Sequence, residues 1–286
     1  MRRRTRRAIP KMIGAVTVLG ACIVGMGTLV MDSIGKEAAD KFGCYANAYQ
    51  RQTAVIVDAS EPRWEIVQGR ALRTYFKQLY EGLSFNERLS VYTTEGDKVA
   101  SVVSPRFSVC GQARSPEELK TVNAPEAQAG YLKRQKERLF QKVLAPELDK
   151  LLTQSPDPSR LQLYESPVME MILSVGRSAK LDSGDRLIVI SDMIQNSESA
   201  RFCRTQNDMP RFSAFKKRRI YRDRLKPGSL AGIEVEALML LREGYGQTGL
   251  QFCASEEELR GFWRDYFNDN GAVDPQFIRI RGSFSG

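Results

Sequence analysis

Short apolar runs alternate along the chain with longer segments in which apolar residues recur every three or four positions. The runs at 53–58, 186–192 and 232–241 are rich in Val, Ile and Leu, which is typical of strands buried on both faces of a sheet. The helical spacing between these runs predicts amphipathic helices. The helices are expected at residues 64–80, 125–152 and 167–179, and from a capping box at Ser255 and Glu258 onward.

Shorter runs complete the predicted sheet. Residues 89–94 and 100–104 alternate in the manner of strands and flank the turn pair Gly96-Asp97, and residues 277–280 predict a final edge strand. Strand–helix–strand units that repeat along a chain form a doubly wound, mostly parallel sheet with helices on both faces. Ligands of such α/β sheets bind at the carboxyl ends of the strands, so we expect a functional site at that edge.

An uncharged apolar segment, residues 12–31, precedes these elements. A helix of about 20 residues spans the ~30 Å hydrocarbon core of a bilayer. Basic residues precede the segment and its other flank is close to neutral, so the positive-inside rule predicts a cytoplasmic N-terminus. We expect a single-pass protein of the bacterial inner membrane with a basic cytoplasmic tail at 1–11, a transmembrane anchor at 12–31, a linker at 32–50 and an extracytoplasmic domain at 51–286.

Two alternatives use the same N-terminal residues. The tetrapeptide that ends in Cys22, Leu-Gly-Ala-Cys, resembles the lipobox of bacterial lipoproteins, in which the cysteine carries the lipid. A cleavable signal peptide is the second alternative, although it needs a shorter apolar stretch than residues 12–31 provide. All three interpretations place the main domain outside the cytoplasmic membrane.

The composition narrows the chemistry. The chain of 286 residues contains no histidine, which excludes Ser-His-Asp and Cys-His catalysis and His-ligated zinc sites. The formal net charge is +9, but a large part of it comes from six basic residues before the apolar segment. These are Arg2, Arg3, Arg4, Arg6, Arg7 and Lys11. The net charge of the remaining residues is small, so no nucleic-acid partner is expected.

One further basic segment, residues 211–226, contains eight Lys and Arg residues interrupted by aromatic residues. In a cytoplasmic protein this pattern would suggest a nucleic-acid surface. Outside the membrane, the available ligands are anionic lipid headgroups or an acidic surface of a partner. A solvated helix face is the simpler interpretation of the same residues.

Four cysteines follow the apolar segment: Cys44, Cys110, Cys203 and Cys253. An even number in an oxidising compartment favours two disulfides, and three connectivities are possible. If the loops after the strands at 100–104 and 186–192 both emerge at the site edge, a Cys110–Cys203 disulfide would join them. Cys44 would then pair with Cys253.

Two apolar strands end in an aspartate, Asp58 after the first and Asp192 at the end of 186–192. Neighbouring parallel strands would bring these carboxylates to one edge, and paired carboxylates suit a hard divalent cation. Ser60 follows the first acid and Ser166 opens a predicted helix, so two hydroxyls could reach the same edge. Ser60, Ser166 and Asp192 also each fit a helix cap, and Asp192 with Gln195 fits a capping box.

With these residues in place, the chain resembles the von Willebrand factor A family over about residues 50–280. The metal-ion-dependent adhesion site of that family combines an Asp-x-Ser-x-Ser loop, a Thr or Ser from a later loop, and an Asp at the end of the fourth strand. Asp58 and Ser60 match the first loop, Ser166 is similar to the later hydroxyl, and Asp192 is similar to the last acid. Pro62 stands where the family has its second serine, so the match is incomplete.

The resemblance implies a site in which Mg²⁺ is held by hydroxyls and carboxylates and is completed by an acidic group of a protein partner. It implies binding and no catalytic residue. We therefore expect a membrane-anchored interaction module that binds a protein partner in the cell envelope. A metal-dependent hydrolase of a phosphorylated or cell-wall substrate, with the same acids as ligands, is one alternative. An ion-free structural scaffold is the other.

Overall fold

The computed structural model describes residues 36–46, 48–58, 66–93, 104–153, 166–202, 209–227, 230–241 and 254–281. The predicted cytoplasmic tail at 1–11 and membrane anchor at 12–31 lie outside this part of the chain. Among the described residues, no helix has both the length and the apolar character that crossing a membrane requires.

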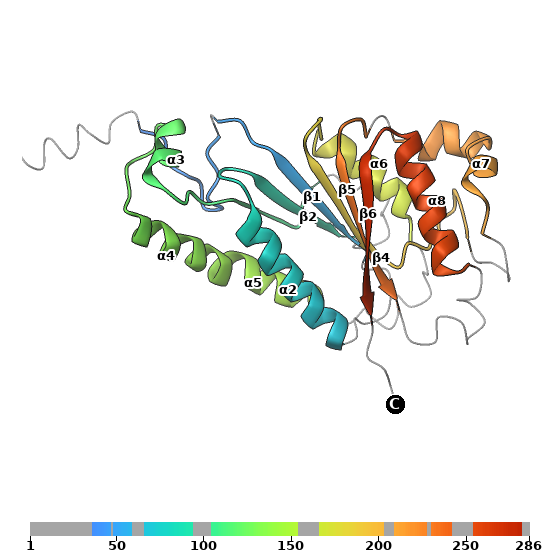
Figure 1. The fold of residues 1–286 in the computed structure, drawn as a ribbon, viewed down its shortest axis with the longest axis horizontal. Coiled ribbons are helices and arrows are strands. Elements are labelled where there is room, and N and C mark those ends of the chain that lie inside the picture. Colours follow the sequence, from blue (N-terminus) through green and yellow to red (C-terminus); the bar gives the residue numbers. More distant parts are fainter. Residues whose placement is uncertain are drawn as a thin grey trace, which may run out of the picture.

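Six strands of the described chain form one mixed sheet (Figure 1). They are β1 (Gln52–Val57), β2 (Arg88–Thr93), β3 (Phe107–Cys110), β4 (Arg186–Ser191), β5 (Glu234–Leu241) and β6 (Val273–Arg281). Their spatial order is β3-β2-β1-β4-β5-β6, and every neighbouring pair is parallel except β2 with β3. The predicted α/β class with a mostly parallel sheet is confirmed. The chain builds outward from β1 in one direction and then in the other, so the switch point lies between β1 and β4.

Helices cover both faces of the sheet because successive strand residues point to opposite faces. In β1, Ala54 and Ile56 belong to one core cluster, whereas Val55 and Val57 belong to the other. The first cluster contains residues of α6 (Val168–Ser178), α7 (Phe212–Phe215), the π-helical turn η4 (Tyr221–Leu225) and α8 (Glu256–Asp269). The second contains residues of α2 (Ile66–Gly82), η2 (Phe140–Leu144) and α5 (Ala145–Thr153).

The long helix predicted at 125–152 is present but is not uniform. It begins as α4 (Ala129–Leu139), continues through the π-helical segment η2 and ends as α5. The π-helical segment places both Phe140 and Leu144 in the core. A short helix that the sequence pattern did not predict, α3 (Pro116–Thr121), begins after the N-cap Ser115.

The prediction of a strand at 100–104 is wrong at Ser104, the residue of this range that the structure describes. Residues 100–103 lie outside the described chain, and Ser104 lies in a bend before β3. The strand that pairs with β2 is β3, which runs antiparallel to it and places Phe107 and Val109 opposite the apolar residues of β2. The apolar pairing, rather than the alternation at 100–104, sets this register.

The predicted disulfide pairing is also wrong. Cys44 is bonded to Cys110, so neither Cys110–Cys203 nor Cys44–Cys253 can form alongside it. The reason is the antiparallel direction of β3, which places Cys110 opposite Arg88 at the start of β2 and therefore at the amino edge of the sheet. Cys203 and Cys253 lie outside the described residues.

Candidate functional site

The candidate site lies at the carboxyl ends of β1 and β4, on either side of the switch point. The parallel register pairs Val57 with Ile190, and the backbone N–H of Asp58 donates to the carbonyl oxygen of Ile190 at 2.9 Å. This register places Asp58 beside Ser191, the last residue of β4. The side chain of Asp58 is buried, with an exposed fraction of 2% for the residue.

Ser166 reaches the site from the segment that precedes α6. Its hydroxyl donates a hydrogen bond of 2.5 Å to Oδ2 of Asp58. Two backbone hydrogen bonds with Asn196, of 2.7 and 2.8 Å, hold Ser166 against the loop that follows β4. The N-cap of α6 is Pro167, which has no side-chain cap bond, so Ser166 is not the cap that its sequence position suggested. This geometry is consistent with the sequence prediction that the Ser166 hydroxyl reaches the sheet edge that carries Asp58.

Ser191 is a site residue that the sequence analysis missed. Its hydroxyl donates to Oδ2 of Asp58 at 3.0 Å and accepts from the backbone N–H of Met193 at 2.9 Å. The signal was present as a hydroxyl at the end of an otherwise apolar strand. It could be used only with the strand order, because β1 must be the neighbour of β4 for Ser191 to meet Asp58.

Asp192 directly follows Ser191, the last residue of β4, and its side chain binds the backbone two residues further on. Its Oδ1 accepts from the backbone N–H of Ile194 at 2.8 Å, and the residue is 6% exposed. The next residue, Met193, has a φ of 64°, in the left-handed region that non-glycine residues seldom adopt. The indole N–H of Trp263 donates to the carbonyl oxygen of Met193 at 2.7 Å and so fixes the turn to α8.

No helix begins after Asp192, so the predicted capping box with Gln195 is wrong. Gln195 instead binds the first turn of α6, where its side-chain oxygen accepts from the backbone N–H of Met169 at 2.9 Å. Its amide also donates to Glu170 at 2.9 Å and to Ser197 at 3.0 Å, and the Ser197 hydroxyl donates to Glu170 at 2.6 Å. This buried network ties the loop after β4 to α6 and thereby positions the segment that carries Ser166.

The oxygens at this edge fit a hard divalent cation in chemical type. Asp58, Asp192, Ser166 and Ser191 supply two carboxylates and two hydroxyls, which are the donors that Mg²⁺ prefers over nitrogen or sulfur. The described residues contain no group of three or more His, Cys, Asp or Glu placed to hold a metal. A cation here would therefore depend on hydroxyls, water or a partner for the rest of its shell. Ser60 and Pro62, the other residues of the predicted loop, lie outside the described chain.

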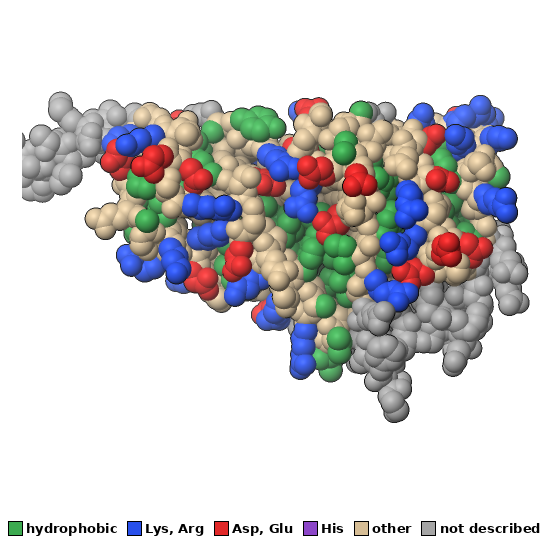
Figure 2. All heavy atoms as spheres, in the orientation of Figure 1, with side chains coloured by type: hydrophobic (Ala, Val, Ile, Leu, Met, Phe, Trp, Pro, Cys, Tyr) green, Lys and Arg blue, Asp and Glu red, His purple; other side chains and the backbone are tan. Residues whose placement is uncertain are grey.

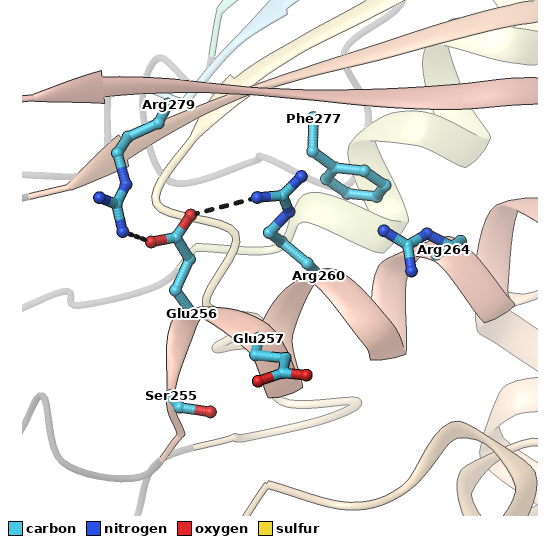
Figure 3. A pocket seen from close by; sticks show the side chains of 7 residues that line it. All are labelled: Ser255, Glu256, Glu257, Arg260, Arg264, Phe277 and Arg279. Atoms are coloured by element: carbon cyan, nitrogen blue, oxygen red, sulfur yellow. Dashed lines mark ion pairs between the residues drawn. The ribbon is translucent and has the colours of Figure 1, made fainter.

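A second hollow lies between α8 and β6, with a volume of about 750 Å³ (Figure 3). Glu256 pairs with Arg279, and with Arg260 at 3.6 Å. The guanidinium groups of Arg260 and Arg264 each lie 5.8 Å from the ring centre of Phe277. Much of the charge in this hollow is thus neutralised within it, and its residues do not include those at the ends of β1 and β4.

Comparisons with protein-family models, with curated proteins and with solved structures found no match to this chain.

Proposed function

We propose that this chain is a membrane-anchored, extracytoplasmic interaction module that binds a protein partner of the cell envelope through a divalent cation at the carboxyl edge between β1 and β4. The observation that carries the proposal is the convergence of the Ser166 and Ser191 hydroxyls on the buried carboxylate of Asp58. They meet at the switch point of the sheet, where ligands of open α/β sheets bind. The similarity of Asp58, Ser166 and Asp192 to the adhesion site of the von Willebrand factor A family supports the same interpretation.

The hydrogen bonds at Asp58 are compatible with a bound cation. A serine hydroxyl has one donor hydrogen and two acceptor lone pairs, so Ser166 can donate to Asp58 while a lone pair faces an ion. If the hydroxyls bind the ion directly and the carboxylates of Asp58 and Asp192 act through water, the charge of Mg²⁺ is only partly compensated in its first shell. A carboxylate of the partner would then complete the shell, because Mg²⁺ requires about six oxygen ligands. In this arrangement the protein recognises an acidic group and breaks no bond.

The direct test is metal-dependent stabilisation of the full chain in detergent, measured with Mg²⁺ and with Mn²⁺ as the probes. A ligand at about 100 times its Kd adds about 2.7 kcal/mol to the free energy of unfolding. For a domain of this size that corresponds to a rise of about 5–10 °C in the melting temperature. Asp58→Asn and Ser166→Ala should abolish the rise. The matched control is Asp265→Asn, which neutralises an exposed acid on α8 and should keep it.

The absence of a rise in the wild-type chain with either metal would refute the cation site. The ion-free scaffold would then be the better interpretation, and one observation favours it: the hydroxyls of Ser166 and Ser191 both donate to Oδ2 of Asp58, as they would in a structural hydrogen-bond network. Turnover of a phosphorylated or cell-wall substrate that requires Asp58 would instead favour the hydrolase.

A further inference from the structure

The basic segment at 211–226 packs at the amino edge of the sheet, opposite the candidate site. Lys216 forms an ion pair of 3.1 Å with Asp269, the last residue of α8. Asn270, which follows α8, donates from its side-chain amide to the Tyr221 hydroxyl at 3.0 Å. Because β6 begins three residues later, at Val273, these contacts place α7 and η4 beside the starts of the strands. Figure 1 shows α7 at the end of the molecule from which β6 descends.

This segment separates its apolar residues from its charged ones. Phe212, Phe215, Tyr221 and Leu225 are buried in the core cluster that also contains α8. All eight Lys and Arg residues of the segment are exposed, and they are accompanied by one acid, Asp223. We call the eight the basic surface: Arg211, Lys216, Lys217, Arg218, Arg219, Arg222, Arg224 and Lys226. Figure 2 shows Lys and Arg side chains gathered at the end of the molecule where α7 lies.

Few of these charges are neutralised within the described part of the chain. Lys216 pairs with Asp269, and Arg219 pairs with Asp223 at 3.0 Å. The other six cations of the basic surface form no ion pair with a described carboxylate. A solvated helix face normally mixes charges of both signs, so a nearly unopposed group of this size indicates an anionic ligand.

The described residues that precede β1 also lie at the amino edge of the sheet. The Cys44–Cys110 disulfide joins them to the end of β3, and the N–H of Cys110 donates to the carbonyl oxygen of Phe42 at 3.0 Å. If the anchor ends at Met31, the five residues that lead to Lys36 span at most about 18 Å. The α3 end of the amino edge, where the N–H of Glu37 donates to the carbonyl oxygen of Asn123, is therefore held close to the bilayer, and a tethered surface meets its ligand at a high effective concentration.

We propose that the basic surface docks on the anionic phospholipid headgroups of the membrane in which the chain is anchored. The amino edge of the sheet then faces the bilayer, and the edge with Asp58 faces away from it, toward a partner. The proposal rests on the proposed function only for the anchor at 12–31 and does not use the cation site. Lipid is favoured over an acidic protein because the tether, by α3, and the basic surface, at α7, both belong to the amino edge, although at its opposite ends (Figure 1).

The test uses the full chain inserted in nanodiscs of phosphatidylcholine, with and without phosphatidylglycerol. Amine acylation followed by mass spectrometry reports the accessibility of each lysine. We expect labelling of Lys216, Lys217 and Lys226 to slow at least threefold in the anionic nanodiscs and to recover at high salt, since headgroup attraction is screened. Labelling of Lys133 and Lys142, on the α4–η2 helix, should be the same in both.

Two triple variants with the same change in net charge distinguish loss of the basic surface from loss of positive charge elsewhere. The triple variant R218Q/R222Q/R224Q should lose the lipid-dependent protection, whereas R70Q/R134Q/R138Q, on α2 and α4, should keep it. Asp58→Asn should also keep it, so a failure of the cation site leaves this result unchanged. Equal labelling of the basic surface in both nanodiscs would overturn the proposal and would favour an acidic protein as its ligand. If the chain does not insert into nanodiscs, the predicted anchor is wrong. Protection of the same lysines by added anionic vesicles then tests whether the basic surface binds lipid.

Discussion

The buried side-chain amide of Gln195 ties the loop that carries Asp192 to α6, and replacing it is the sharpest test of how the site is positioned. Gln195 is fully buried. Its side chain accepts one hydrogen bond, from the N–H of Met169, and donates two, to Glu170 and Ser197. Gln195→Ala removes all three and leaves the Met169 N–H, in the first turn of α6, without this acceptor.

The expected cost follows from the groups that lose their partners. A buried N–H left unpaired costs about 1–3 kcal/mol, and a hydrogen bond to a charged group such as Glu170 contributes about 1.5–3 kcal/mol. The lost Cγ methylene group adds about 0.8 kcal/mol when buried. We expect Gln195→Ala to lower the free energy of unfolding by about 3–5 kcal/mol, a large part of the 5–15 kcal/mol typical of a whole domain.

Urea unfolding of the full chain in detergent, followed by tryptophan fluorescence, measures this difference because Trp263 donates to the same loop at Met193. Gln141→Ala, which removes one exposed hydrogen bond on η2, is the control and should stay within about 0.5 kcal/mol of wild type. The exchange E170Q/Q195E keeps one amide and one carboxylate in the network and should recover most of the loss. A cost below about 1 kcal/mol for Gln195→Ala would show that the network does not hold the loop.

Two further predictions concern other parts of the domain. Because the first two cysteines after the apolar segment are paired, a non-reducing peptide map should join Cys203 to Cys253, whose neighbours Phe202 and Ala254 share one core cluster; free thiols at both would refute this. The pKa of Glu258 is lowered because its carboxylate accepts hydrogen bonds from the backbone N–H and the hydroxyl of Ser255, the N-cap of α8. The stabilisation that this carboxylate gives the fold is therefore present at neutral pH. It is lost as the pH falls below 4.5 toward the folded pKa. The advantage of wild type over Glu258→Gln, less than about 1 kcal/mol at this exposed position, should therefore shrink in acid unfolding curves, and an advantage that grows in acid would contradict the assignment.

The sequence predicted the elements whose burial is strong and local. The runs that became β1, β4 and β5 were found because both faces of the strands are apolar, as with Val55 on one face of β1 and Ile56 on the other. It failed at β3, because that strand is defined by its pairing with β2 and not by its own pattern. The disulfide prediction failed for the same reason. The position of Cys110 depends on the direction of β3, which no local pattern encodes.

The candidate site was predictable in its residues but not in its contacts. Strand ends give Asp58 and Asp192, since a buried strand that stops at an acid is visible along the chain. The role of Ser191 requires the neighbour relation of β1 and β4. The role of Gln195 requires the loop after β4 to return to α6. Local capping rules assigned Gln195 to the wrong helix start, because the same side-chain oxygen can satisfy an N–H that is distant in sequence.

The hydrogen bonds around Asp58 also limit what a mutation there can prove. Asp58→Asn removes the charge that a cation needs, but it also places an amide where two hydroxyls now donate, so a loss of stability alone would not separate a cation site from a scaffold. Ser166→Ala is more informative, because it removes a potential ligand while Ser191 still donates to Asp58. A scaffold predicts that this variant loses the same stability with and without Mg²⁺. A cation site predicts that it loses more in Mg²⁺, because the wild type alone gains from the metal.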